Sequence, residues 1–348
     1  MERVLYTFDD VLIAPARSAI EPSTAVVGSA AARGLFLTVP VLSAAMDRVT
    51  SPKLAIAVAK AGGLGVLHRN CTKEEQAKMV KEVKKAGATV AAACGPFDSE
   101  RAQFLAAAGA DVIIIDCAHG HNMKVLKSAK AIKAKLPKHV KMIVGNIATA
   151  EAAADIIAMK FADGLKVGVG PGSICTTRLV SGVGMPQLTA IMDVAKVAKK
   201  AGIPVIADGG MRTSGDVAKA LAAGASAVMV GNLFAGTTET PGKIVTKNGK
   251  KFKEYRGMGS KPVIGGDSGS QRYLTKGRKA VPEGVVGLVP LKGSASEVVA
   301  EIASGVQVAM GYVGAKDVPE FQKKAKFIRV TLASTVEGRP HSLSEILD

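Results

Sequence analysis

The chain has 348 residues, of which 48% are hydrophobic and only 4% are aromatic, with 38 glycines and no tryptophan. This length provides for one large α/β domain or two smaller ones with a substantial core. The charged N-terminal segment excludes a signal peptide, and no apolar run approaches the length of a membrane span, so we expect a cytoplasmic protein without a membrane partner.

Short apolar runs alternate with amphipathic helical patterns through the first two thirds of the chain. The runs predict strands over residues 39–44, 65–68, 90–93, 112–115, 142–144, 165–167, 205–207 and 227–230. The patterns between them predict helices over residues 52–61, 73–86, 99–108, 123–136, 150–159, 188–201 and 215–223.

Eight apolar strands that alternate with helices indicate a parallel sheet, and eight is the number that closes a TIM (β/α)8 barrel. The similar segments GADVIIID at 109–116 and GASAVMVG at 224–231 support such a repeat. A doubly wound open sheet is the alternative. No GxGxxG follows the first strand, which counts against a dinucleotide-binding sheet of that kind.

Candidate functional residues follow directly after most of the predicted strands, where a barrel enzyme carries its functional groups. The candidates at these positions are Met46, Asp47, His68, Arg69, Asn70, Asp116, Asn146, Asp208, Gly209, Gly210, Gly231 and Asn232. This clustering indicates an enzyme.

The segment 166–184 follows the sixth strand and combines glycines at 168, 170 and 172 with Ser173, Cys175 and Thr177. The glycines allow close approach of the backbone to a ligand, and a Gly-rich turn followed by serine suits an anion such as a phosphate. A cysteine two residues further is well placed to attack a molecule that the phosphate anchors. A Gly-rich turn with an inert cysteine is the alternative interpretation of this segment.

The pattern changes after residue 232. Residues 233–295 are rich in glycine, lysine and threonine and include a predicted hairpin with Asn248-Gly249 at its turn. A loop of this length in a compact domain is usually functional or disordered, and we interpret it as a flap over the barrel mouth. A helix over 295–310 and a tail complete a single catalytic domain that spans 1–348.

The formal net charge of +17 is compatible with an anionic partner such as a nucleotide or a nucleic acid. The lysines are spread along helical segments with no interleaved aromatic residues, which favours a lysine-rich surface over a nucleic-acid-binding one. The four cysteines, at 71, 94, 117 and 175, show no metal-binding spacing, so we expect reduced thiols.

Four motifs together resemble those of the IMP dehydrogenase/GMP reductase family of TIM-barrel enzymes: LSAAMD at 42–47, GVGPGSICTTR at 168–178, IADGG at 206–210 and YRGMGS at 255–260. The resemblance covers nearly the whole chain. It implies NAD-dependent oxidation of IMP to xanthosine monophosphate in guanine nucleotide biosynthesis, through a covalent thioimidate on Cys175 that is then hydrolysed.

The resemblance also implies roles for the matching residues, with Cys175 as the nucleophile on C2 of the purine. Contacts to the substrate phosphate, ribose and base would come from Met46, Ser173, Asp208, Gly209, Gly210, Gly231, Asn232, Tyr255, Gly257, Met258, Gly259 and Glu283. The nicotinamide side of NAD would meet Asp116, Asn146 and Gly168.

Dehydrogenases of this family carry an Arg-Tyr pair in the flap, which here corresponds to Arg272 and Tyr273. The resemblance implies that Arg272 helps to activate the hydrolytic water. An arginine is a poor base because its guanidinium stays charged. Chemistry alone supports Tyr273, Thr177 and Glu283 as groups that relay a proton or position the water.

The family further implies a monovalent cation, normally potassium, held by carbonyl groups of the catalytic loop and of a neighbouring subunit's tail. The matching positions are Gly170, Gly172, Cys175, Glu337, Gly338 and Arg339. A cation shared in this way implies a homotetramer with cyclic symmetry.

The chain departs from the dehydrogenase pattern in three places. The segment around Lys81 to Lys85 runs directly into the next strand, so the usual pair of cystathionine-β-synthase-type (CBS) regulatory modules is absent. MDRVTS at 46–51 replaces MDTVTE, and Asn232 stands where serine is common. The shortened chain has the length of a GMP reductase, which leaves an NADPH-dependent GMP reductase as the first alternative. A non-catalytic nucleotide- or RNA-binding barrel is the second.

Overall fold

The structure, a computed structural model, describes residues 3–264, 281–340 and 342. Eight parallel strands form its central sheet, in the spatial order β4-β11-β10-β9-β8-β7-β6-β5. The strands are β4 (Val41–Ser43), β5 (Gly65–Leu67), β6 (Val90–Cys94), β7 (Val112–Asp116), β8 (Lys141–Ile147), β9 (Gly164–Val167), β10 (Val205–Asp208) and β11 (Ala227–Val230).

The sheet closes between its first two strands. The Leu64 N–H donates to the carbonyl oxygen of Val41 at 3.0 Å, and the Ser43 N–H donates to that of Leu64 at 3.1 Å. A parallel bridge between Leu42 and Leu64 completes this junction. The predicted TIM barrel is therefore confirmed, and each of the eight predicted strands is found within a few residues of its expected bounds.

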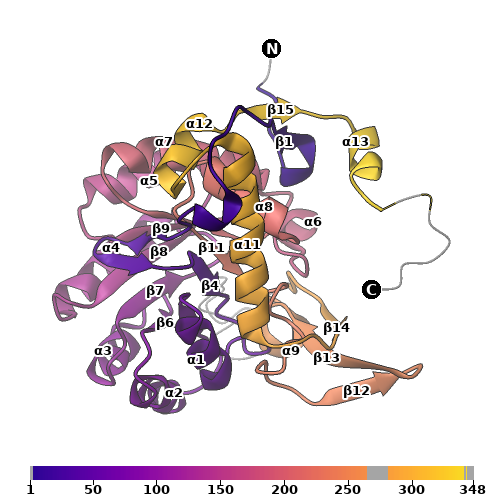
Figure 1. Cartoon of the computed structure of the whole chain (residues 1–348). Helices are drawn as coiled ribbons and strands as arrows, with labels where there is room; N and C mark the ends of the chain where they lie inside the picture. Colours follow the sequence, from indigo (N-terminus) through magenta and orange to yellow (C-terminus); the bar gives the residue numbers. More distant parts are fainter. Residues whose placement is uncertain (1–2, 265–280, 341, 343–348) are drawn as a thin grey trace.

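Helices surround the barrel (Figure 1), and the seven predicted ones are all found. They are α1 (Pro52–Lys60), α2 (Lys73–Lys85), α3 (Ser99–Ala107), α4 (Met123–Lys135), α5 (Ala150–Ala158), α7 (Gln187–Lys200) and α8 (Ser214–Ala222). The helix expected at 295–310 extends further, as α11 (Ala295–Val313), and packs between α8 and α1. It therefore completes the outer ring after β11.

The connection between α2 and β6 is short. The helix ends at Lys85, Gly87 adopts a φ of 73°, and β6 begins at Val90. This leaves no inserted module between the two elements, as the sequence predicts.

A small hairpin closes the N-terminal end of the barrel, a feature that the sequence did not reveal. It consists of β2 (Ser29–Ala32) and β3 (Leu35–Leu37). The side chains of Ala31 and Ala32 are fully buried among apolar residues of the barrel interior such as Ile143 and Ile206. The opposite end, where the strands terminate, is left open for a site.

The predicted hairpin after β11 is also found, as β12 (Ile244–Lys247) and β13 (Lys250–Arg256). Asn248 and Gly249 both have positive φ, at 52° and 73°, as a two-residue hairpin turn requires. β14 (Val286–Pro290) adds a third antiparallel strand, and α9 (Lys261–Ile264) follows β13. The expected behaviour of 233–295 as a flap depends on residues outside the described part of the chain.

A strand from the first part of the chain and one from its last part lie side by side at one edge of the molecule (Figure 1). β1 (Val11–Ile13) pairs antiparallel with β15 (Phe327–Arg329). The remaining elements are η1 (Phe8–Asp10), η2 (Pro22–Thr24), α6 (Thr177–Ser181), α12 (Val318–Lys324) and α13 (Leu332–Glu337).

Close packing of α1 against β5 depends on a glycine. A Cβ atom added at Gly65 would lie 2.3 Å from the Cβ and 2.4 Å from the Cα of Ala55. We therefore expect Gly65→Ala to lower the free energy of unfolding by about 1–3 kcal/mol through overpacking. Thermal unfolding measures this, and Gly287→Ala is the matched control, because a Cβ there meets nothing within 4 Å. Equal midpoints for both variants would contradict the close contact.

Candidate active site

A cavity lies at the carboxyl ends of the barrel strands, where the sequence predicts the functional groups. It is lined by all the predicted substrate and cofactor residues and by further predicted residues of the Gly-rich loop, which come from segments far apart in the sequence. These are Met46, Asp116, Asn146, Gly168, Gly170, Gly172, Ser173, Cys175, Thr177, Asp208, Gly209, Gly210, Gly231, Asn232, Tyr255, Gly257, Met258, Gly259 and Glu283.

The Gly-rich loop after β9 packs tightly on the end of β10. Gly168 has a φ of 151°, and a Cβ at this position would lie 2.2 Å from the carbonyl oxygen of Asp208. Gly209 and Gly210 have φ values of 87° and 88°, which favour glycine. The loop closes on itself where the Cys175 N–H donates to the Gly172 carbonyl at 3.1 Å. The backbone can therefore approach a ligand closely at this wall.

The thiol of Cys175 begins a short chain of hydrogen bonds. Its sulfur donates to the hydroxyl oxygen of Thr177 at 3.1 Å, and the Thr177 hydroxyl donates to Oε2 of Glu283 at 2.7 Å. A carboxylate thus stands one hydroxyl group away from the thiol. This arrangement can carry a proton from sulfur to a carboxylate without further movement.

Main-chain contacts hold Glu283 in that position. The Thr176 N–H donates to the carbonyl oxygen of Glu283 at 3.0 Å, and the Glu283 N–H donates to that of Gly259 at 2.9 Å. The Val285 N–H donates in turn to Ile174 at 3.0 Å. Residues 283–285 therefore lie between the catalytic loop and the loop after β13, a pairing that no local sequence pattern indicates.

A buried lysine connects the ends of four consecutive strands, β7 to β10. Lys166 is 2% exposed, and its ammonium donates to Oδ1 of Asp116 at 3.0 Å and to Oδ2 of Asp208 at 2.6 Å. It also contacts the amide oxygen of Asn146. The Asn146 amide group donates to Asp208 at 2.9 Å and to the Gly168 carbonyl at 2.7 Å. One cation therefore orients the predicted ribose-binding and cofactor-binding side chains.

The far side of the cavity is formed by Tyr255 on β13. Burial raises the pKa of Tyr255 to about 12, which a hydrogen bond with Ser173 partly offsets and the charge of Asp208 increases. The phenol therefore stays protonated at neutral pH. A Cβ at Gly231 would lie 3.0 Å from this hydroxyl and 3.2 Å from the sulfur of Met46, so glycine keeps this corner open.

The hairpin β12–β13 is attached to the loop after β4 by side-chain contacts, one of which comes from Arg48, a departure from the pattern that the resemblance implies. Nε of Arg48 lies 2.8 Å from Glu254 on β13, which attaches the hairpin to the loop after β4. Asp47 pairs with Arg256 of the same hairpin and accepts a hydrogen bond from the Asn70 amide at 2.8 Å. The main-chain carbonyl oxygen of Asn232 accepts a hydrogen bond from Lys292 at 3.2 Å, a contact that does not depend on the side chain at this position.

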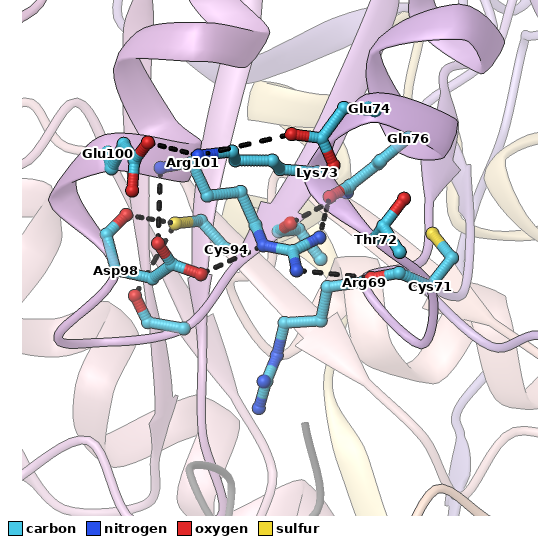
Figure 2. A network of polar contacts seen from close by, with 12 residues as sticks. Arg69, Cys71, Thr72, Lys73, Glu74, Gln76, Cys94, Asp98, Glu100 and Arg101 are labelled. Atoms are coloured by element: carbon cyan, nitrogen blue, oxygen red, sulfur yellow. Dashed lines mark hydrogen bonds and ion pairs between the residues drawn. The ribbon is translucent and has the colours of Figure 1, made fainter. Parts of the chain in front are cut away.

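A separate polar network lies beside the site and is centred on Arg101 (Figure 2). Its guanidinium donates to Asp98 at 2.9 Å, to the Gln76 amide oxygen at 2.8 Å and to the Cys71 carbonyl at 3.1 Å. Burial raises the pKa of the Cys71 thiol to about 11 and that of the Cys94 thiol to about 12. Both thiols therefore stay protonated at neutral pH.

The cavity lining does not include the predicted tail residues, and two further predicted residues are not described. Arg272 and Tyr273 lie outside the described residues. Glu337 and Gly338 end α13, which packs against η1 of the same chain. Within the described ranges, no hydrogen bond or ion pair links Glu337, Gly338 or Arg339 to the loop at 168–177.

Lys166 and Gln187 are functional neighbours that sequence reasoning missed. The Gln187 amide group donates to the carbonyl oxygens of Val167 and Asp208 at 3.0 and 3.1 Å, which fixes the end of β10. The available signal for Lys166 was a single charged residue inside an otherwise apolar strand, which is costly unless it is paired. Gln187 stands at the first position of a helix and carried no comparable signal.

Among the described residues, no three or more His, Cys, Asp or Glu side chains come together as ligands for a metal ion. None of the helices in this part of the chain has the length and apolar character of a membrane span.

Comparison with known proteins agrees with this geometry. A family model described as "IMP dehydrogenase / GMP reductase domain" matches residues 5–341. The inosine-5'-monophosphate dehydrogenase of Methanocaldococcus jannaschii is 40% identical over 473 aligned positions, with 97% of this chain and 95% of that protein covered. Because 473 positions exceed the 348 residues of this chain, that relative carries inserted sequence that this chain lacks.

Other relatives align with less inserted sequence. The inosine-5'-monophosphate dehydrogenase of Borreliella burgdorferi is 39% identical over 395 positions, with 98% of this chain and 97% of that protein covered. That of Cryptosporidium parvum is 38% identical over 383 positions, with 97% and 95% covered. Short forms close to the length of this chain therefore occur among its relatives.

Removal of the buried lysine tests the network at the strand ends. Lys166→Met leaves the carboxylates of Asp116 and Asp208 close together without their cation, so we expect the free energy of unfolding to fall by about 3–5 kcal/mol. Thermal or denaturant unfolding measures the change, with the exposed Lys196→Met as the control. A loss no larger than that of the control would show that the charges at this site are balanced by other means.

Proposed function

We propose that this chain, which belongs to the IMP dehydrogenase/GMP reductase family, is an IMP dehydrogenase. The proposed reaction is the oxidation of IMP to xanthosine monophosphate with NAD, a step of guanine nucleotide biosynthesis. The observation that carries the proposal is the series Cys175–Thr177–Glu283 at the mouth of the barrel. A thiol with a carboxylate one hydroxyl away, beside a glycine-built wall, suits covalent capture of a nucleotide.

In the proposed complex the substrate phosphate lies against the glycines that end β10 and β11, with Ser173 and the protonated Tyr255 as hydrogen-bond donors. Asp208 receives the ribose hydroxyl groups, as a carboxylate acceptor oriented by Lys166. Met46, Met258, Gly259 and Glu283 line the base. Each of these side chains borders the cavity that also contains Cys175.

The first chemical step is attack of the Cys175 sulfur on C2 of the purine. The thiol proton moves to Thr177 as the Thr177 proton moves to Glu283, which leaves the sulfur free to form the C2–S bond. Departure of the C2 hydrogen as hydride then yields a thioimidate. Division of one difficult oxidation into two simpler steps is the advantage of a covalent nucleophile.

The second step is hydrolysis of the thioimidate. A water molecule adds to C2, its proton passes to a base, and the C2–S bond breaks to return the thiolate and release xanthosine monophosphate. Glu283 first releases to solvent the proton that it took from the thiol, and through Thr177 it is then the base that the described geometry supports best for the proton of the water. Arg272 and Tyr273 remain proposed partners in this step because of the family resemblance.

The residues assigned to NAD suit the groups that they would hold. NAD supplies the acceptor for the hydride when it is bound. Asp116 and Asn146 end neighbouring strands, β7 and β8, and offer a carboxylate and an amide to ribose hydroxyl groups at the border of the same cavity. Gly168, between them and the catalytic loop, presents backbone without a side chain.

A monovalent cation is proposed at the catalytic loop, held by the carbonyl groups of Gly170, Gly172 and Cys175. Oxygen ligands of this kind suit a hard cation, which would stiffen the loop that carries the nucleophile. The tail residues Glu337, Gly338 and Arg339 lie beside η1 of their own chain, so their contribution would come from a neighbouring subunit. A cyclic homotetramer is the assembly that we propose on this basis.

Substitution of the proposed nucleophile is the direct test. We expect Cys175→Ala to reduce NADH formation from IMP by more than about 10³-fold, because no covalent intermediate can form. The assay follows absorbance at the NADH band in the presence of IMP, NAD and potassium. Cys71→Ala is the matched control, since its thiol lies outside the cavity and stays protonated.

The same assay separates the alternatives. Oxidation of NADPH with GMP, and no NADH formation from IMP, would favour a GMP reductase. Absence of turnover with either nucleotide, together with RNA binding that weakens steeply with salt, would favour a non-catalytic barrel.

The proton relay has its own prediction. Glu283→Gln keeps an oxygen for the Thr177 hydroxyl but cannot accept a proton, so we expect kcat to fall by about 10²–10⁴-fold with a smaller change in KM. The exposed Glu301→Gln serves as the control. A kcat within a factor of about three of the unsubstituted enzyme would assign the base elsewhere.

A further inference from the structure

A second buried lysine, Lys253 on β13, has an environment that differs from that of Lys166. Its side chain is 5% exposed, and its ammonium lies within hydrogen-bond distance of three main-chain carbonyl oxygens. These belong to Thr237 at 2.9 Å, Thr238 at 3.2 Å and Thr240 at 2.8 Å, all in the connection between β11 and β12. The Thr240 hydroxyl oxygen lies 3.4 Å away.

The oxygens around this ammonium are neutral. Within the described part of the chain, no carboxylate oxygen lies within ion-pair distance of Lys253. Burial lowers the pKa of Lys253, the charge of Lys53 lowers it further, and that of Glu239 opposes the shift. Main-chain carbonyl oxygens are among the ligands that proteins offer to hard metal cations, and here they surround an ammonium group.

The connection that carries these carbonyls is fixed on its other sides. The Glu239 carbonyl accepts a hydrogen bond from the Ser51 hydroxyl at the start of α1, at 3.0 Å, and its carboxylate accepts one from the Ala295 N–H at the start of α11, at 2.9 Å. The Thr238 N–H donates a hydrogen bond to the carbonyl oxygen of Gly293 at 3.1 Å. Lys253 therefore joins β13 to a part of the barrel that two helices already hold.

The position of Lys253 along β13 relates this anchor to the candidate site. Side chains alternate along a strand, so Lys253 and Tyr255 share the buried face, while Glu254 points the other way and pairs with Arg48. The hydroxyl group of Tyr255 shares a hydrogen bond with the side chain of Ser173 at the proposed phosphate end of the cavity. A shift of β13 against the 237–240 segment would move this hydroxyl.

We propose that the Lys253 ammonium acts as a built-in monovalent cation that locks β13 to residues 237–240 and so places the Tyr255 hydroxyl for the substrate phosphate. Lys253 is thus a positioning residue, two positions away from the group that it places. The inference rests on the proposed function only for the assignment of the phosphate to Tyr255. The three carbonyl oxygens around the Lys253 ammonium, which we call the carbonyl cage, are independent of that assignment.

Truncation of the lysine tests the lock. Lys253→Ala removes the cation and leaves three carbonyl groups around a small cavity, so we expect a lower thermal unfolding midpoint. We also expect KM for IMP to rise about tenfold with a smaller change in kcat, as for the loss of one hydrogen bond to the substrate. Lys251→Ala is the matched control, because Lys251 lies on the same strand and is exposed.

Chemical rescue separates a cation site from a general loss of packing. n-Propylammonium contains the atoms that the truncation removes, and it should raise both the unfolding midpoint and the affinity for IMP of Lys253→Ala at constant potassium concentration and ionic strength. Tetramethylammonium, which has no N–H group, should not. Neither compound should act selectively on the unsubstituted protein or on Lys251→Ala.

The outcomes are distinguishable. If the unsubstituted protein does not oxidise IMP, the proposed function fails, but rescue of the unfolding midpoint by n-propylammonium still supports the cage. Equal behaviour of Lys253→Ala and Lys251→Ala, or no selective effect of n-propylammonium, overturns the inference. If Lys253→Ala does not fold, Lys253→Met retains the stem without the charge, and a KM for IMP equal to that of Lys251→Ala would then overturn it.

Discussion

The ion pairs of one buried lysine constrain the whole site. Lys166 comes from β9 and contacts side chains at the ends of β7, β8 and β10, so four neighbouring strands share a single charge. Two carboxylates at such a short distance would repel each other in a site of low dielectric constant, and the ammonium removes that repulsion. The orientation of Asp208, and with it the proposed ribose contact, follows from the same interaction. The barrel therefore does more than carry the loops, because the charge of Lys166 orients the side chains of Asp116, Asn146 and Asp208 at the bottom of the cavity.

The walls of the cavity are assembled on top of this floor from segments distant in sequence. The Gly-rich loop lies against Gly209 and Gly210, residues 283–285 pair with the loop, and the β12–β13 hairpin contributes Tyr255. Ion pairs from Arg48 and Asp47 attach the hairpin to the loop after β4. Arg48, at a position where the family resemblance leads us to expect threonine, thus supplies one of these contacts between the barrel and the hairpin.

Much of this architecture could be predicted from the sequence, because apolar runs and helical periodicity are local signals. The eight strands, the helices and the Asn248-Gly249 turn are of that kind. The strands of the β2–β3 hairpin are only four and three residues long, too short to show a clear alternating pattern. The strands β1 and β15 are equally short, and each finds its partner at a distant point of the chain, so no local pattern identifies that pair. In the site, the glycines and Cys175 were recognisable as a motif. Lys166 was not, since its three partners lie in other strands and only the closed barrel brings them together.

The β1–β15 pairing has a consequence for how the protein is made. During synthesis on the ribosome, Val11 emerges long before its partner Arg329, which lies on the other side of the whole barrel in the sequence. Strand β1 therefore has no partner until β15 has been synthesised, and the barrel can fold before the two strands pair. The entropic cost of closing a loop grows only slowly with its length. Once the folded barrel holds β1 and β15 close together, most of that cost has been met, and the two strands can pair at little further cost in free energy. We therefore expect the β1–β15 pair to form late, after the barrel has folded.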